Sequence, residues 1–360
     1  MKLPKALLRM MALSAVLILI VGFAEKPQDL PEGVHMKLSD YGFFQGEMAQ
    51  LDPVNGVVPY DLNTPLFSDY AWKQRFVKLP EGASVDFNDH EVLDFPVGTV
   101  LIKTFYYPHD ERNPEKGRQL LETRLLIHQE AGWRAVPYHW NDDQTEAYLE
   151  VAGGRKQISW KDSKGKKQKL EYVMPNQNQC KGCHSFKGAM RPIGPSARQL
   201  NGEYAFAHGT QNQLEHWKAQ NMMTNLPEDW SKVPKAPVWD DPSTGSIDER
   251  ARIWLDINCA HCHNEHGPAS TSGLFLDIHQ DDPYIWGIHK SPVAAGRGSG
   301  GLLYDIIPGD PNSSILMLRI ESEDPGVMMP EVGRKVVHKE SAELINDWIQ
   351  QMDPKDYPRP

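Results

Sequence analysis

The stretch NQCKGCHSF (residues 178–186) holds two cysteines three positions apart, with a histidine directly after the second. The stretch NCAHCHNEH (residues 258–266) repeats this pattern. Together the two stretches contain all four cysteines of the 360-residue chain. No cysteine is left to link distant segments, so the use of these two pairs decides how the surrounding chain must fold.

The spacing and the histidine are what attachment of a c-type haem needs. Two thiols three residues apart lie along one helical turn, where each can form a thioether with one porphyrin vinyl group. The next residue, a histidine, can then ligate the iron. The pattern predicts two covalent haems, attached through Cys180, Cys183, Cys259 and Cys262 and ligated by His184 and His263.

Three other uses of paired cysteines remain as alternatives. One zinc site shared by the two pairs would join segments far apart in the sequence and would leave the two histidines unexplained. A thioredoxin-like redox pair is expected once, at a strand-to-helix junction, and neither pair has that context. A disulfide within C-x-x-C would hold little chain together.

The N-terminus, MKLPKALLRMMALSAVLILIVGFA (residues 1–24), has basic residues, then an apolar run, then small residues. This order predicts a signal peptide cleaved after Ala24 and an exported, periplasmic location. The alternative is an uncleaved membrane anchor, although the apolar run is short for about 30 Å of hydrocarbon. The formal net charge of −10 argues against nucleic acid and suits basic protein partners.

Residues 25–174 are predicted to form a β-rich module, sandwich-like or barrel-like. Short stretches of alternating or β-branched residues follow one another, with Gly, Pro, Asp and Lys clusters between them. The expected strands lie within residues 95–107, 122–128, 132–140, 146–151, 155–160 and 169–174.

Two mostly α-helical haem-binding regions are predicted to follow, which makes the fold class multidomain α+β. Residues 175–240 hold the first motif and one expected helix, at 211–223. Residues 246–360 begin with a capping box, Ser246 and Glu249, on a helix that runs into Cys259. A second amphipathic helix is expected at 341–352, and a loop-rich stretch between two such helices suits a large flat ligand.

The sixth ligand of the second iron is predicted to come from GVMMPEVG (residues 326–333). Met329 is the preferred ligand and Met328 the fallback, because a Met-Met-Pro loop flanked by glycines is poor core material. His261, inside the second motif, is expected to face solvent at the haem edge.

The sixth ligand of the first iron stays open among four candidates. Met190 is close to the motif, Met222 and Met223 end the predicted helix at 211–223, and His139 belongs to a predicted strand. Methionines in a helix and histidines in a strand are both common as simple packing residues.

The region from Ser246 to Met352 resembles a class I cytochrome c domain in its helix into CAHCH, its PGDPNSSILMLRI and MMPEVGR segments and its closing DWI helix. Over most of its length the chain resembles an uncharacterised family of exported dihaem c-type cytochromes, through TPLFSDYAWKQRFVKLPEG, ETRLLIH, NQCKGCHSF and RPIGPSARQLN. The resemblance implies the same haem roles for both motifs and for Met329. It also implies a parallel β-helix protein as a companion, and it names no substrate.

The expected function is single-electron transfer by an exported dihaem cytochrome within a periplasmic redox chain, with other redox proteins as partners. One alternative is a peroxidase-like dihaem oxidoreductase whose first haem is the reaction site, so a catalytic role stays open. Another alternative is that the β-rich module binds a polymer or a partner protein and that the haems connect it to a redox chain.

Overall fold

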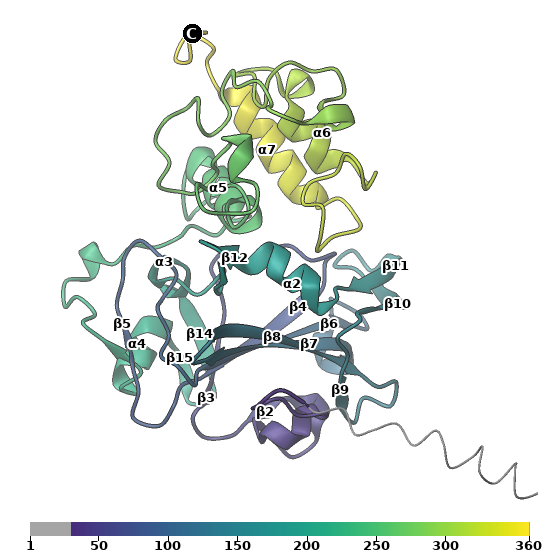
Figure 1. Cartoon of the computed structure of the whole chain (residues 1–360), viewed down its shortest axis with the longest axis vertical. Coiled ribbons are helices and arrows are strands. Elements are labelled where there is room, and N and C mark those ends of the chain that lie inside the picture. Colours follow the sequence, from purple (N-terminus) through teal and green to yellow (C-terminus); the bar gives the residue numbers. More distant parts are fainter. Residues whose placement is uncertain (1–29, 360) are drawn as a thin grey trace, which may run out of the picture. The chain divides into compact units, whose positions relative to one another are not determined.

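The computed structural model describes residues 30–359 (Figure 1). The predicted signal peptide, residues 1–24, lies outside the described residues. The chain divides by its contacts into two units, and the longer one, Met36–Pro360, carries the helices and strands given below. The three predicted regions after residue 36 lie within this one unit, and their boundaries stay a prediction.

A six-stranded antiparallel sheet forms the centre of the β-rich part (Figure 1). Neighbouring strands are hydrogen-bonded in the order β3-β4-β6-β7-β8-β9, so the sheet is open and β3 and β9 are its edges. Its strands are β3 (Val57–Tyr60), β4 (Trp72–Lys78), β6 (Val100–Pro108), β7 (Arg118–Gln129), β8 (Gly132–Trp140) and β9 (Ala147–Leu149).

The predicted strands from residue 95 onward are confirmed, with β6 starting at Val100 rather than Phe95. One face of the sheet is covered by the N-terminal segment of the unit, where Phe44 packs edge-on against Phe76 at 5.1 Å between ring centroids. That segment consists of η1 (Leu38–Tyr41), β1 (Phe44–Gln45), η2 (Met48–Gln50) and β2 (Asp52–Pro53).

The other face carries two hydrophobic clusters, one toward each end of the strands. The hairpin of β10 (Gly154–Lys161) and β11 (Lys167–Met174) packs Ile158 and Trp160 against Phe105 in the first cluster. The second cluster joins Leu101 of the sheet to Trp217 of a helix in the middle region. Between the clusters, this face of the sheet is left for the cavity described below.

The middle region, residues 175–240, contains short helices and hairpins in similar measure, so it is mixed rather than mostly α-helical. Its elements are α2 (Gln177–His184), β12 (Ser185–Phe186), β13 (Ala189–Met190), α3 (Ala197–Leu200), β14 (Glu203–Phe206), β15 (Gly209–Asn212), α4 (Gln213–Ala219), β16 (Met223–Thr224) and η4 (Trp230–Lys232). Helix α2 packs on strand β8 of the sheet.

Helix α4 is shorter than the helix predicted at 211–223. It ends at Ala219, because Asn221 adopts a left-handed backbone with φ of 57°. Met222 and Met223 therefore follow the helix, and β16 pairs in parallel with β5 (Val85–Asp86). The prediction that these methionines end a helix is wrong.

The C-terminal region is helical, as predicted. Its helix α5 (Ile247–Leu255) begins at the predicted capping box, in which the Ser246 and Glu249 side chains each bond the other's backbone N–H. The other elements of this region are a π-helical turn (Asp256–Ala260), α6 (Ile315–Glu321), α7 (Lys339–Gln351) and the 3-10 turns Ser270–Ser272, Gly296–Ser299 and Pro311–Ser313. One further 3-10 turn, Pro114–Lys116, lies in the sheet module. Helix α7 confirms the helix predicted at 341–352.

A single hydrophobic cluster holds these helices together. Trp254 of α5, Met317 of α6 and Ile345 of α7 are all at most 3% exposed within it. The Trp348 indole donates a hydrogen bond to Asp248 at 2.8 Å, which joins α7 to α5. Burial of such side chains contributes about 1.5–3 kcal/mol each, so the cluster accounts for much of the stability of this region.

The segment after β3 connects the sheet module to the C-terminal region. The Phe67 N–H donates to the side-chain oxygen of Asn258, directly before the second motif, at 2.8 Å. The buried Asp69 carboxylate accepts from the N–H groups of Lys335 and Val336 at 2.6 and 3.0 Å. These hydrogen bonds fix the position of the sheet module relative to the C-terminal region.

We predict that Asp69→Ala lowers the free energy of unfolding by about 2–4 kcal/mol, because two N–H groups lose their acceptor. Asp69→Asn is the matched control: it keeps an acceptor oxygen and tolerates the left-handed φ of 51° at this position. Its expected loss is below about 1.5 kcal/mol, with urea unfolding as the measurement. Equal losses for the two variants would contradict this role of the carboxylate.

Candidate functional site

Helix α2 carries the first motif in its last two turns. Asn176 caps the helix by accepting from the Gln179 N–H, and the Gln179 side chain accepts from the Asn176 N–H, both at 2.9 Å. The Gln177 side chain donates to the Ala135 carbonyl oxygen at 2.7 Å and so ties the helix to β8. The thiols of the motif are thereby held against the sheet.

His184, the last residue of α2, has only one ring nitrogen free. Its Nδ1–H donates to the Arg191 carbonyl oxygen at 2.8 Å, so Nε2 carries the lone pair. Burial lowers the pKa of His184 to about 4, which keeps the imidazole neutral at physiological pH. A histidine oriented through Nδ1 and neutral at Nε2 has the form of a metal ligand.

The second motif begins in the π-helical turn Asp256–Ala260, where α5 widens, and such local irregularities often mark functional sites. The His263 N–H donates to the Cys259 carbonyl oxygen at 2.9 Å. The Ser272 hydroxyl donates to the Ala269 carbonyl oxygen at 2.7 Å, so its oxygen accepts from His263 Nδ1–H, over 3.4 Å. Nε2 of His263 is again the free nitrogen.

The two motifs lie in direct contact although they are far apart in sequence. The Cys262 Sγ is 3.9 Å from the Gly182 carbonyl oxygen. The Lys187 N–H donates to the His266 carbonyl oxygen at 3.2 Å, which joins the segments that follow the two motifs. The fold therefore brings both predicted attachment sites to one place.

A cavity of about 1480 Å³, counted to its open mouth, extends from the first motif to the C-terminal region. We call it the main cavity. Its lining joins α2 (Cys180, Cys183, His184) to the sheet (Lys103, Arg124) and to Met329 of the C-terminal region.

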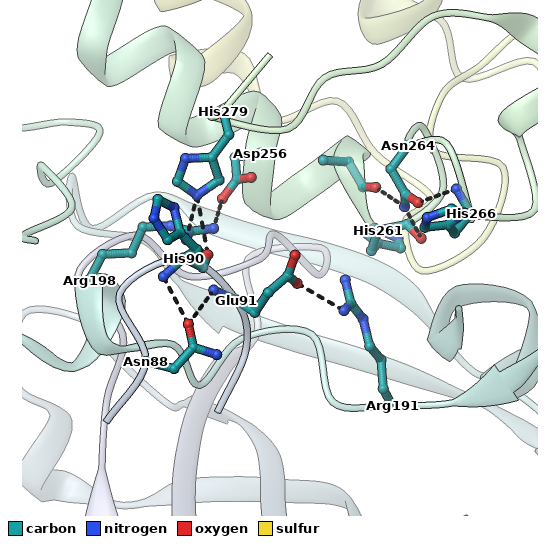
Figure 2. Close-up of polar contacts among 11 residues, drawn as sticks. Asn88, His90, Glu91, Arg191, Arg198, Asp256, His261, Asn264, His266 and His279 are labelled. Atoms are coloured by element: carbon teal, nitrogen blue, oxygen red, sulfur yellow. Dashed lines mark hydrogen bonds and ion pairs between the residues drawn. The ribbon is translucent and has the colours of Figure 1, made fainter. Parts of the chain in front are cut away.

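A second cavity, of about 990 Å³, lies on the other side of the first motif, and we call it the polar cavity. Figure 2 shows two ion pairs at its wall, Arg191 with Glu91 at 3.0 Å and Arg198 with Asp256 at 3.1 Å. The side chain of His184 lines both cavities. These two ion pairs join four of the charged side chains in the wall of the polar cavity.

The two methionines of the predicted ligand loop differ in their surroundings. Met329 lines the main cavity, whereas Met328 is 4% exposed and lines neither cavity. The buried Arg334 guanidinium donates through Nε and Nη2 to the Met329 carbonyl oxygen, at 2.9 and 2.6 Å, and through Nη2 to that of Ile320. This arginine fixes the backbone on which Met329 stands.

None of the four candidate sixth ligands of the first iron lines either cavity. Met190 lies on β13, paired with Ser185 directly after the first motif. Met222 and Met223 pack in the hydrophobic cluster around Trp217. His139 lies on β8, paired with Glu122 and Tyr148 of the neighbouring strands.

Sequence reasoning misjudged His261 and missed the charged side chains of the sheet. His261 is half-buried and lines both cavities, and its Nδ1 has no contact with solvent, so the expectation that it faces solvent is wrong. Burial and the nearby His184 lower its pKa to about 4. Lys103 and Arg124 could not be linked to the motifs, because only the strand register brings them there.

The donor atoms of both motifs fit a c-type haem. All four thiols are free, and each histidine has one nitrogen held and the other available. Within residues 30–359, no three His, Cys, Asp or Glu side chains converge to hold a bare metal ion. A haem iron needs no such convergence, because the porphyrin supplies four of its ligands.

Comparisons with known proteins identify no relative. No protein-family model, no curated protein and no solved structure matches the chain. In the part of the chain that the structure describes, no helix has the length and apolar character needed to cross a membrane.

His338 also lines the main cavity and is mostly buried. It stacks on Phe67 with 4.1 Å between ring centroids and also contacts Tyr70 and Trp239. Its side chain is 13% exposed, and burial lowers its pKa to about 4 although the Glu340 carboxylate is 3.8 Å away. Protonation of this imidazole is therefore unfavourable in the folded state.

We predict that His338→Phe reduces the acid sensitivity of the fold. The unfolded chain binds a proton near pH 6.5 and the folded one only near pH 4, so the contribution of His338 is complete above pH 6.5 and is lost as pH falls toward 4. The unfolding free energy of the wild type should fall by up to about 3 kcal/mol more than that of the variant.

Urea unfolding at pH 7 and pH 4.5 measures this difference. The exposed His109, replaced by Phe in the same way, is the control and should leave the wild-type pH dependence intact. Parallel pH profiles for the wild type and His338→Phe would rule out the role of His338.

Proposed function

We propose that the chain is an exported c-type cytochrome that holds two covalent haems and transfers single electrons. The observation that carries this proposal is the contact between two complete C-x-x-C-H motifs, each with a histidine held through Nδ1. When bound, each haem iron would accept and release one electron at a time. The chain's own task is then to attach, orient and shield the two groups.

The direct contact of the motifs supports transfer between the two groups. Cys262 of the second motif meets Gly182 of the first at 3.9 Å, and one cavity reaches from His184 to Met329. Apolar side chains such as Leu101 and Ile257 line much of the same cavity. A low-dielectric, rigid surrounding lowers the reorganisation that accompanies a change of charge.

We also propose that the C-terminal region is a class I cytochrome c domain. Helices α5 and α7 pack on each other, α6 packs on α7, and the second motif directly follows α5. Met329 lines the main cavity on a loop between α6 and α7. These features support the proposal, and the proposed sixth ligand of this iron is Met329.

A second candidate function is haem-dependent reaction with a small molecule at the first motif. It is favoured by one observation: the predicted sixth ligands of this iron line neither cavity, whereas Lys103 and Arg124 do line the main one. A free coordination position beside hydrogen-bond donors favours substrate activation over simple electron transfer.

Removal of each cysteine pair tests the proposed function. The wild type, matured in a host that attaches c-type haem, should weigh two haems more than its polypeptide. We expect Cys180→Ser with Cys183→Ser, and Cys259→Ser with Cys262→Ser, to lose one haem each, because each pair supplies both thioethers of one group. Mass spectrometry and haemochrome absorption measure this. A wild-type mass without haem would reject the proposal.

Carbon monoxide separates the two candidate functions. An electron carrier with both irons fully ligated should bind carbon monoxide slowly or not at all after reduction. Rapid binding to one haem, lost when Cys180 and Cys183 are replaced, would favour the reactive first site instead.

We predict that Met329→Leu lowers the midpoint potential of the second haem by more than 59 mV, a tenfold change for one electron, because loss of the thioether destabilises reduced iron. Met328→Leu is the matched control on the adjacent residue, and a volume-conserving change costs below about 1.5 kcal/mol. Redox titration with optical detection measures both variants. A shift only in Met328→Leu would assign the ligand to the fallback residue.

A further inference from the structure

A row of three cationic side chains crosses the sheet face inside the main cavity. Arg75 of β4 is directly opposite Lys103 of β6, and Lys103 is directly opposite Arg124 of β7. Directly paired residues of antiparallel strands share one face, so the three side chains stand side by side. All three line the main cavity together with Cys183 and His184.

The charges of this row are only partly balanced by the protein. Arg124 donates to both oxygens of the buried Glu122, at 2.5 and 2.8 Å. Arg75, which is 4% exposed, bonds Asp61 through Nη1, but its buried Nη2 has no partner among the described residues. In the same part of the chain Lys103 has no ion pair, and its Nζ only lies 4.8 Å from the ring centre of Phe105.

The composition of the cavity wall also shows an excess of positive charge. Its lining contains four cations, namely the row and Arg334, and no Asp or Glu. Like charges directly opposite each other destabilise a sheet, and unpaired buried charges cost several kcal/mol each. Desolvation and the neighbouring Arg75 lower the pKa of Lys103 well below its usual value. An anion in the cavity would relieve all of these costs.

We propose that Arg75, Lys103 and Arg124 form a carboxylate-binding wall that takes the propionates of the haem attached at Cys180 and Cys183. This inference rests on the proposed function. A haem carries two propionate carboxylates on the edge of the ring opposite its two thioethers, and guanidinium and ammonium groups are their natural partners. Helix α2, which bears both thiols, packs on the sheet that bears the row.

The wall has a second effect, on the electron affinity of the first iron. Reduction removes one positive charge from the iron, and a nearby cation favours the less positive state. The row therefore raises the midpoint potential of the first haem as well as orienting it. Arg75 and Lys103 act here as positioning residues, through the porphyrin edge rather than at the iron.

The test uses the mature two-haem protein and three variants. Lys103→Met removes a charge of the wall, and we expect the first-haem potential to fall by at least 59 mV, a tenfold change for one electron. Lys103→Arg keeps the charge and should shift it by less than a third of that. Lys156→Met, which removes a lysine paired with Asp142 outside both cavities, is the control and should leave it unchanged.

Further measurements separate this inference from its rivals. Both haems should stay attached in all variants by mass, and a protein without haem would contradict the proposed function itself. Two attached haems with an unchanged potential in Lys103→Met would reject the propionate wall. A change of the first iron from low spin to high spin in both Lys103 variants, seen by electron paramagnetic resonance, would make Lys103 an iron ligand and also reject it.

Titration of the wild type with acetate distinguishes the two sources of carboxylate. If propionates occupy the wall, acetate should produce no saturable change in potential or spectrum. A saturable response that Lys103→Met abolishes would show that the wall binds a free carboxylate, and it would overturn the assignment to the haem.

Discussion

The buried carboxylate of Asp69 accepts hydrogen bonds from two consecutive N–H groups just beyond the methionine loop, and the form of the main cavity depends on this contact. The sheet supplies one wall of the cavity, and the C-terminal region supplies the other. The hydrogen bonds of Asp69, together with the one from the Phe67 N–H to the Asn258 side chain, fix the distance between these two walls. The contact between the two motifs, at Cys262 and Gly182, adds to this connection.

Much of the architecture was accessible from the sequence because its signals are local. Alternation from Val100 to Tyr107 predicted β6, and the Ser246–Glu249 capping box predicted the start of α5. Each C-x-x-C-H motif occupies only five consecutive residues, so both candidate haem motifs could be recognised without knowledge of the fold. The end of α4 was not, because an asparagine such as Asn221 fits a helix as readily as a left-handed turn.

The rest of the candidate site depends on pairing between distant segments. Arg75, Lys103 and Arg124 come from three strands, and only the register of the sheet makes them neighbours. His261 was expected to face solvent because nothing in its own segment indicates that it lines the cavities beside the first motif. Local patterns therefore predicted the two candidate attachment motifs, whereas the charged side chains around them could be placed only in the three-dimensional structure.

The contact between Cys262 and Gly182 has a consequence for biogenesis. Under the proposed function, each thiol must be reached by the machinery that forms the thioether, whereas in the folded chain Cys180 is buried and Cys183, Cys259 and Cys262 are half-buried. On this proposal, covalent attachment is expected to precede the packing of the first motif against the second. The final packing of the two motifs would then depend on bound haem, so that a chain lacking haem would not complete its fold.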